Sequence, residues 1–271
     1  LIDLSMLESQ DAEVERLLAA EIHHAFDLAQ GPLFRATLLC LQPQREHVLL
    51  LNLHHTVGDG WSLEVLQREL AVLYNAFSQG QRTPLPELPL QYADYAAWQR
   101  QWLEAGERQR QLAYWRTQLG DTHPVLQLPT DHPRRPGADH VAASHGLQLP
   151  AELVGSLRRR AQAQDATLFV LLLAGLQAVL HRYTGQEDIR VGVPIANRHH
   201  PGSENLIGTL VNTLVIRTSL EGDPSFTEVL ERVKASALDA YEHQDMPFEL
   251  LVRALGHQRD PGQPPLANVM F

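Results

Sequence analysis

The sequence predicts an α/β fold with one large lobe or two moderate ones, and three observations favour this class. The chain has 271 residues, of which 44% are hydrophobic, so it can bury a sizeable core. Short apolar runs at 33–41, 47–53, 189–195 and 210–217 are typical of buried strands. Longer segments between these runs repeat apolar residues at helical spacing.

The N-terminal part of the chain predicts helices that alternate with strands. Residues 11–24 have the spacing of an amphipathic helix that covers a sheet face. The strands 33–41 and 47–53 follow, joined by a polar turn. The proline-rich stretch 83–89 cannot be helical, because each proline removes a backbone donor. A helix from Ser62 should place the following side chains in the core: Leu63, Leu66, Leu70, Leu73 and Phe77.

An aromatic stripe precedes the stretch that we interpret as the linker between lobes. Its spacing predicts two helices whose aromatic side chains are core residues. Residues 120–138 are rich in proline and lack periodicity, as expected of a linker. We therefore expect an N-terminal lobe over 1–125 and a C-terminal lobe over 126–271. The aromatic residues of the stripe are Tyr92, Tyr95, Trp98, Trp102, Tyr114 and Trp115.

The C-terminal part predicts three strands and four helices. Thr167 is the expected N-cap of the most apolar helix. The arginine run 158–160 predicts a solvated helix face, with contact to a carrier protein as the alternative. The predicted strands are 146–149, 189–195 and 210–217, and the predicted helices are 151–163, 167–183, 225–241 and 246–255.

Composition excludes several classes of function. A net charge of −10 and a pI near 5.7 argue against a nucleic-acid groove, which needs a basic stripe. The longest apolar runs are too short to span a membrane. Cys40 is the only cysteine and lies in an apolar run, so it predicts a buried hydrophobic residue and no internal disulfide. We expect a cytoplasmic protein.

The stretch 54–60, His-His-Thr-Val-Gly-Asp-Gly, follows the strand 47–53 and precedes a helix, which is where α/β folds place functional side chains. Side chains alternate along a strand, so one imidazole should face the site and the other the interior. A neutral imidazole can accept a proton from an attacking amine or hydroxyl. Asp59 should hold the turn through backbone N–H groups or an arginine, with Arg35 and Arg198 as candidate partners. We expect Gly60 to adopt backbone angles that other residues resist.

A metal site is the competing interpretation of this stretch, because histidine and aspartate are both ligands. Adjacent histidines on a strand diverge, and the sequence has no second cluster such as Cys-x-x-Cys or His-Glu-x-x-His. We therefore predict no metal. A second pair, His199 and His200, lies in a loop with proline and glycine and without a following aspartate, so we expect it to be exposed to solvent.

The motif resembles the His-His-x-x-x-Asp-Gly signature of the chloramphenicol-acetyltransferase-like acyltransferases. With Trp61 and Ser62 following, it is similar to the condensation domains of nonribosomal peptide synthetases. Four further stretches match that family in order, and they spread over nearly the whole chain: Tyr-Ala-Asp-Tyr-Ala-Ala-Trp-Gln at 92–99, Ile-Gly-Thr-Leu-Val-Asn-Thr at 207–213 with Leu210 where phenylalanine is usual, His-Gln-Asp-Met-Pro-Phe-Glu at 243–249, and Asn-Val-Met-Phe at 268–271.

The resemblance implies a two-lobed α/β sandwich fold. It also implies an enzyme that forms a peptide bond between two amino acids. The donor, an aminoacyl or peptidyl thioester, and the acceptor amino acid are held on the phosphopantetheine arms of two carrier proteins, and an adenylation domain belongs to the same assembly. The domain itself binds no cofactor. The motif stretches resemble those of domains that accept an L-configured donor, and they depart from epimerization and heterocyclization domains.

The resemblance also assigns roles to single residues. His55, the second histidine, is the catalytic residue, acting as a general base or by orienting the amine and stabilising the tetrahedral intermediate. His54, Asp59 and Gly60 are structural or supporting. A backbone N–H near Gly60 could bind the oxyanion. Candidates for contacts with the tunnel or the carriers are Trp61, Ser62, Arg198 and Asn212.

Two family motifs upstream of the catalytic histidine are absent, including a segment whose arginine braces the active-site turn. We therefore expect a fragment with a truncated N-terminal lobe and an incomplete C-terminal lobe, which by itself should not catalyse condensation. Two other functions remain open. One is a non-catalytic platform of the same fold that recruits a partner enzyme, and the other is an acyltransferase that uses coenzyme A.

Overall fold

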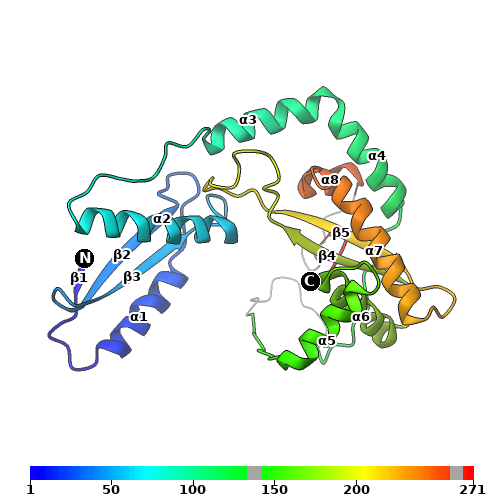
Figure 1. Ribbon diagram of the computed structural model, residues 1–271, viewed down its shortest axis with the longest axis horizontal. Coiled ribbons are helices and arrows are strands. Elements are labelled where there is room, and N and C mark those ends of the chain that lie inside the picture. The colour runs from blue at the N-terminus through cyan, green and yellow to red at the C-terminus, as the bar shows by residue number, and fades with distance from the viewer. Residues whose placement is uncertain (133–141, 257–264) are drawn as a thin grey trace. The chain divides into compact units, whose positions relative to one another are not determined.

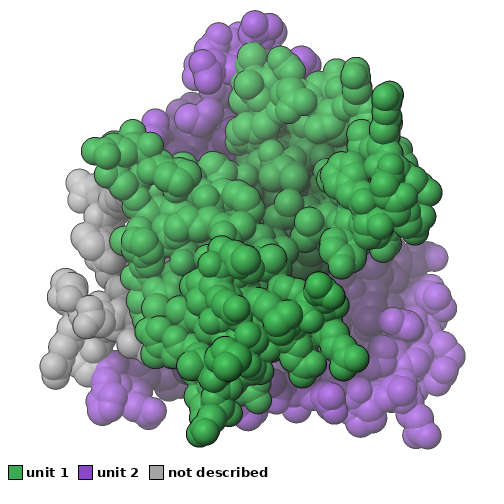
Figure 2. Space-filling view, turned by 90° about the vertical axis from the view of Figure 1, so that its left-hand side faces the viewer, with its two compact units in different colours: residues 1–97, 198–210 green, residues 98–197, 211–271 purple. Residues whose placement is uncertain are grey.

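The computed structural model describes residues 1–132, 142–256 and 265–271. Backbone contacts divide the chain into two compact units, which Figure 2 draws in different colours: unit 1 comprises residues 1–97 and 198–210, and unit 2 comprises residues 98–197 and 211–271. The segment 198–210 therefore belongs to unit 1 although both of its neighbours in sequence belong to unit 2. The division into lobes at residue 125 does not coincide with these units and stays a prediction.

Unit 1 contains a three-stranded sheet in the order β1 (Ile2–Asp3), β2 (Phe34–Gln42) and β3 (Glu46–Leu53). The strands β2 and β3 form the predicted antiparallel hairpin, and β1 pairs with β2 in parallel (Figure 1). Helix α1 (Gln10–His23) packs on the sheet as expected, because Val14 and Leu17 contact a small buried cluster. Cys40 in β2 is buried, as predicted.

Helix α2 (Gly60–Ser78) starts directly after the motif, but its buried face differs from the prediction. Leu63, Leu70 and Phe77 are 42%, 41% and 58% exposed, so they are not core residues. The buried face carries Ser62 and Val65 instead. Ser62 hydrogen-bonds to Gly208. Val65 lies one turn later on the same face of the helix, so this contact places Val65 in the interior as well.

Unit 2 has its core around the antiparallel pair β4 (Asp188–Ile195) and β5 (Asn212–Ser219). Helices α6 (Leu168–Thr184) and α7 (Phe226–Glu242) pack on the two strands and on each other, and α5 (Ala151–Gln162) packs on α6. These five elements lie where the sequence predicts them, within two residues at each end. Their side chains form one buried cluster that includes Leu173, Ile189, Val191, Leu214, Ile216 and Val233.

The aromatic stripe lies on α3 (Tyr92–Trp102) and α4 (Arg108–Leu119), which a π-helical turn, η1 (Leu103–Glu107), connects. The core prediction is confirmed for Tyr95 and Trp115, which are buried. It is wrong for Tyr92 and Trp98, which are 37% and 39% exposed. Trp98 stacks on Trp102 with ring centroids 5.6 Å apart. The short helix α8 (Phe248–Ala254) forms within the predicted range and packs on α4 and β5.

The strand predicted over 146–149 is wrong. Residues 142–150 have no regular structure, and Leu147 is 79% exposed, so the alternation of this short stretch faces no core. Residues 120–132 are also irregular, as expected of the predicted linker, whose residues 133–138 lie outside the described part. The arginine run 158–160 is exposed, as predicted. Of the helices in the described ranges, none has the length and apolar character that a bilayer crossing requires.

The N-cap of α6 can be tested directly by mutation. Thr167 accepts a hydrogen bond from the Val170 N–H at 3.2 Å, as the sequence predicts. Thr167→Ala should lower the free energy of unfolding by about 1 kcal/mol, because the N–H loses its partner. Thr117 is the matched control, since it is exposed inside α4 and its hydroxyl donates to the Ala113 carbonyl of the same helix. Thr117→Ala should be neutral or slightly stabilising. Urea unfolding measures both, and equal losses would contradict the assignment of the cap.

Candidate functional site

The motif forms a closed turn at the end of β3. The His54 N–H donates to the Leu33 carbonyl at 2.9 Å, and the Val57 N–H donates to the His54 carbonyl at 3.0 Å. The His54 Nδ1 accepts the Thr56 N–H at 3.2 Å and lies 2.9 Å from the Thr56 hydroxyl oxygen. The ring is half-buried and meets Phe26 edge-on. These contacts tie the His54 ring to the turn, and its supporting role stays a prediction.

The His55 side chain is exposed, whereas His54 is half-buried. Strand β3 ends at Leu53, so the two histidines lie in the turn, and the alternation of a strand does not account for this difference. Within the described part of the chain, no residue hydrogen-bonds to its imidazole. Its carbonyl accepts a hydrogen bond from the hydroxyl of Thr209. The peptide group of His55 is therefore held, while its ring remains available to a substrate.

Asp59 is buried and caps α2. Its Oδ1 accepts the Ser62 N–H at 2.8 Å, the Ser62 hydroxyl at 2.7 Å and Arg198 Nη2 at 2.8 Å. Its Oδ2 accepts the Leu210 N–H at 3.0 Å. The predicted ion pair with Arg198 is confirmed. Arg35, the other candidate partner, pairs with Glu21.

Arg198 is held as firmly as the carboxylate that it pairs with. Its side chain is 2% exposed, and its Nη1 donates to the carbonyls of Ser203 and Leu206 at 2.9 and 2.7 Å. Burial alone would raise the pKa of the Asp59 carboxyl. The hydrogen bonds from Ser62, Leu210 and Arg198 outweigh that effect and hold the pKa below its ordinary value.

Gly208 packs directly against an aromatic ring. A Cβ on this residue would lie 2.1 Å from Cδ2 of Tyr92, so only glycine fits. The Gly208 N–H donates to the Ser62 hydroxyl at 3.1 Å, which places the segment 198–210 against the start of α2. The Tyr92 hydroxyl in turn donates to the Thr209 carbonyl at 3.0 Å.

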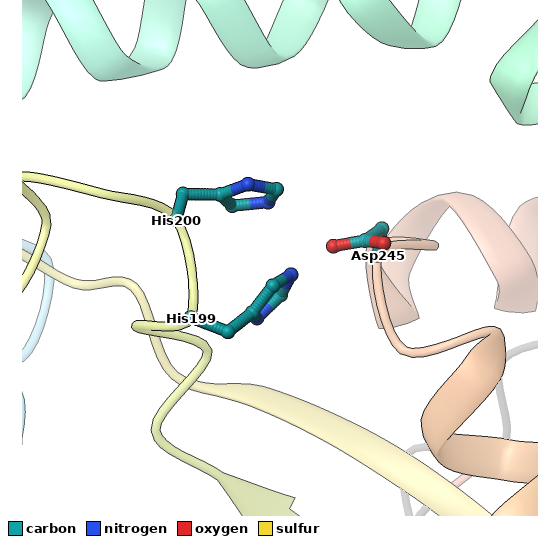
Figure 3. Close-up of side chains that lie close together, drawn as sticks. All are labelled: His199, His200 and Asp245. Carbon is teal, nitrogen blue, oxygen red and sulfur yellow. The ribbon is translucent and has the colours of Figure 1, made fainter.

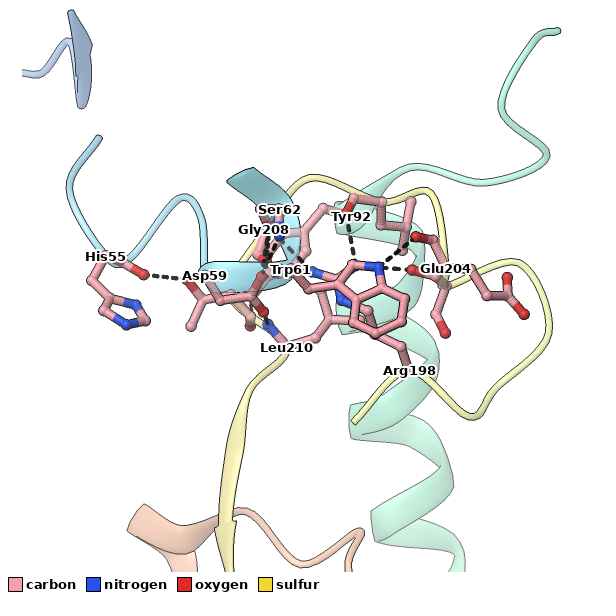
Figure 4. Close-up of polar contacts among 12 residues, drawn as sticks. His55, Asp59, Trp61, Ser62, Tyr92, Arg198, Glu204, Gly208 and Leu210 are labelled. Carbon is pink, nitrogen blue, oxygen red and sulfur yellow. Dashed lines mark hydrogen bonds and ion pairs between the residues drawn. The ribbon is translucent and has the colours of Figure 1, made fainter. Parts of the chain in front are cut away.

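Two further contacts join α2 to the segment 198–210. The indole N–H of Trp61 donates to the Glu204 carbonyl at 2.9 Å, and Arg68 donates to the side chain of Asn205 at 2.7 Å (Figure 4 shows Trp61 and Glu204). Trp61 is 41% exposed, so it keeps a free surface beside the motif. Ser62 and Arg198, by contrast, are buried in the turn's own hydrogen bonds.

Gly60 behaves differently from the expectation. It is the first residue of α2 and has no positive φ, so the prediction of unusual backbone angles is wrong. A Cβ at this position would meet no atom within 4 Å, which means that the absence of a side chain leaves open space at the helix start. Among the described residues, none accepts a hydrogen bond from the N–H groups of Gly60 and Trp61. These two donors belong to the first turn of a 19-residue helix.

Asn212 is a predicted candidate for contacts with the tunnel, but its side chain is occupied within unit 2. It is buried, and its Nδ2 donates to the carbonyls of Gln244 and Met246 at 2.8 and 2.9 Å. Its Oδ1 accepts the Phe248 N–H at 3.0 Å, at the start of α8. These bonds connect the start of β5 to residues 243–249. The family-matching stretches 207–213 and 243–249 are therefore hydrogen-bonded to each other.

The second histidine pair lies in the segment 198–210. Figure 3 shows the rings of His199 and His200, whose centroids are 4.0 Å apart; Asp245, drawn in the same figure, belongs to unit 2. His199 is exposed, as predicted, while His200 is half-buried and its ring faces Tyr95.

Sequence reasoning missed Thr209 and Tyr92 as parts of the site. Both lie in stretches that match the family, at 207–213 and 92–99. Thr209 occupies a position that the family pattern leaves variable, so only the fold reveals its bond to the His55 carbonyl. The aromatic character of Tyr92 indicates core packing and does not indicate a hydrogen bond to the segment that holds the motif.

Comparison with known proteins gives consistent matches. The sequence profile described as Condensation domain matches residues 1–271. One component of the linear gramicidin synthase of Brevibacillus parabrevis is 48% identical over 262 residues, which cover 97% of this chain and 3% of that protein. Malpinin synthetase of Mortierella alpina is 43% identical over 270 residues, which cover 100% of this chain and 4% of that protein. The chain therefore spans only a small part of these relatives.

Two solved structures are also similar. The X-domain in its complex with OxyB from teicoplanin biosynthesis has a TM-score of 0.88 at 29% identity, covering 99% of this chain and 59% of that one. The first condensation domain of the calcium-dependent antibiotic synthetase, in complex with a substrate analogue, has a TM-score of 0.75 at 28% identity, covering 98% and 62%. These matches confirm the predicted chloramphenicol-acetyltransferase-like α/β fold.

The charge of Asp59 should make part of the stability depend on pH. Because its folded pKa lies below the unfolded value, the carboxylate stabilises the fold above about pH 4, and this contribution is lost as the pH falls through the folded pKa. Asp59→Asn should therefore be less stable than the wild type at pH 7, and the difference should shrink between about pH 5 and pH 3.

Urea unfolding at pH 7, 5, 4 and 3 measures this difference. Asp11→Asn is the matched control, since Asp11 is exposed in the first turn of α1 and should change stability little at any of these pH values. A difference between the wild type and Asp59→Asn that stays constant down to pH 3 would show that the carboxylate charge is not what stabilises the turn.

Proposed function

Because the chain belongs to the condensation-domain family, we propose that it forms a peptide bond in nonribosomal peptide synthesis. The acceptor's α-amine nitrogen attacks the carbonyl carbon of the donor thioester. A C–N bond forms, the C–S bond breaks, and the sulfur leaves with the proton that the amine loses. The domain is thus an acyltransferase whose substrates arrive on carrier proteins.

The observation that carries this proposal is the exposed imidazole of His55 on a turn whose other groups are fixed. His55 follows His54, whose ring is hydrogen-bonded to Thr56. It precedes the buried Asp59 by four residues. A reactive side chain on a rigid support is the arrangement that proton transfer or amine orientation requires. Both of these roles remain open for His55.

The start of α2 supports a site for the oxyanion. The N–H groups of Gly60 and Trp61 are not used by the described residues, and the open space at Gly60 leaves access to them. The N-terminus of a helix favours negative charge, so these donors suit the oxygen that becomes negative in the tetrahedral intermediate. In this proposal, Trp61 also offers its exposed ring to the substrate arms.

We propose that the partners are a donor and an acceptor carrier protein and an adenylation domain of the same assembly. Substrates then enter on phosphopantetheine arms, and the domain itself holds no cofactor. The donor residue is L-configured, because the stretches 207–213 and 243–249 resemble those of L-accepting domains. The assembly operates in the cytoplasm. The similarity to a linear gramicidin synthase supports the general setting.

A non-catalytic platform is the second candidate, and the similarity to an X-domain solved with OxyB favours it. Such platforms tend to lose the motif, whereas His55 and Asp59 are both present here. An acyltransferase that uses coenzyme A is the third. It would turn over free acyl-coenzyme A without any carrier protein, which a single assay distinguishes.

The test is to replace His55 in the intact synthetase that contains this domain. His55→Ala should lower the rate of peptide-bond formation by about two to four orders of magnitude, the range of general-base catalysis, without loss of folding. Mass spectrometry of the product bound to the carrier measures the rate. His47→Ala, at an exposed position of β3, is the matched control and should react like the wild type. If His55→Ala forms product as fast as the wild type, His55 does not carry the reaction and the proposal fails.

A further inference from the structure

The peptide group that follows His55 is fixed by a residue far away in sequence. The carbonyl of His55 accepts the hydroxyl hydrogen of Thr209, which lies 154 residues later. Two other hydrogen bonds of the turn are local, since the Val57 N–H donates to the His54 carbonyl and the Thr56 N–H donates to the His54 ring. In the described part of the chain, Thr209 is thus the contact from outside the motif that acts on the backbone of His55.

Thr209 is itself held from both sides. Its carbonyl accepts the hydroxyl hydrogen of Tyr92 at 3.0 Å, and the next residue, Leu210, donates its N–H to Asp59 at 3.0 Å. The preceding Gly208 packs under the Tyr92 ring with no room for a Cβ. Burial and the nearby charge of Asp59 raise the pKa of Tyr92, so its hydroxyl remains a donor at neutral pH.

The orientation of a peptide group affects the side chain beside it. The carbonyl of His55 is bonded directly to its Cα, so rotation about the Cα–C bond changes how the imidazole is placed relative to the rest of the turn and to α2. Reacting groups must approach to about 3–3.5 Å, and a displacement of about 1 Å can cost on the order of a hundredfold in rate. A contact that holds this carbonyl therefore affects catalysis more than it affects stability.

We propose that Thr209 is a positioning residue for His55, and that Tyr92 positions Thr209. The Thr209 hydroxyl fixes the carbonyl of His55, and through it the direction of the imidazole. This inference rests on the proposed function, because it presumes that the His55 ring acts on the substrate. It names two residues that the motif comparison did not assign to the reaction.

The experiment uses the intact synthetase with both carriers loaded. Thr209→Val keeps the shape of the side chain but loses the hydroxyl, and it should lower kcat by about 10- to 100-fold. The KM for the loaded acceptor carrier should stay within about twofold, because Thr209 binds the turn and not the substrate. Thr209→Ser keeps the hydroxyl and should restore at least half of the wild-type kcat. Tyr92→Phe should give a smaller loss of kcat, because it acts only through Thr209.

The outcomes separate this inference from the proposed function. Wild-type kcat in Thr209→Val overturns the inference, and so does an equal loss of kcat in Thr209→Ser. If Thr209→Val unfolds at a lower temperature and Thr209→Ser does not restore kcat, the residue serves stability and the inference is again overturned. Full activity of His55→Ala would instead overturn the proposed function. An inactive His55→Ala beside a fully active Thr209→Val leaves the function standing and removes only the positioning role.

Discussion

The site depends on the buried ion pair between Asp59 and Arg198. Burying two charges costs free energy unless their polar atoms find partners, and removal of one partner strands the other charge. Here the carboxylate accepts hydrogen bonds from Ser62, Leu210 and Arg198, while the guanidinium also donates to the carbonyls of Ser203 and Leu206. The pair therefore requires the motif, the start of α2 and the segment 198–210 to fold together.

This requirement explains how the turn keeps its shape although the side chain of His55 forms no hydrogen bond with the described residues. The segment 198–210 forms hydrogen bonds to the turn, to α2 and to the start of α3, so the backbone around His55 is fixed from outside. The His55 imidazole takes no part in these bonds. Much of this rigidity comes from Arg198 and Thr209, which lie 139 and 154 positions after their partners Asp59 and His55. Reactivity stays with one exposed ring.

Much of this architecture could be predicted from the sequence, because its signals are local. Apolar runs indicate the strands β2 to β5, and Thr167 marks the start of α6. Arg198 is one of two candidates for the partner of Asp59. The family stretches then identify the fold.

The predictions failed where long-range contacts decide the outcome. The buried face of α2 follows from the bond of Ser62 to Gly208, which no spacing within the helix reveals. Gly60 lacks unusual backbone angles, and Asn212 uses its amide to bind α8 and the residues before it. Thr209 donates to the backbone carbonyl of His55. Because every residue has such a carbonyl, the residue types of the motif do not show which distant residue binds it.

A double-mutant cycle on Asp59 and Arg198 tests the central claim most directly. Urea unfolding of the wild type, Asp59→Ala, Arg198→Ala and the double variant gives the coupling free energy between the two side chains. Each single change should cost about 3–5 kcal/mol, because it leaves one buried charge without its partner. The double variant should cost less than the sum of the two by at least about 1 kcal/mol. Additive losses would mean that the two side chains stabilise the fold independently, and the ion pair would then not be what holds the site together.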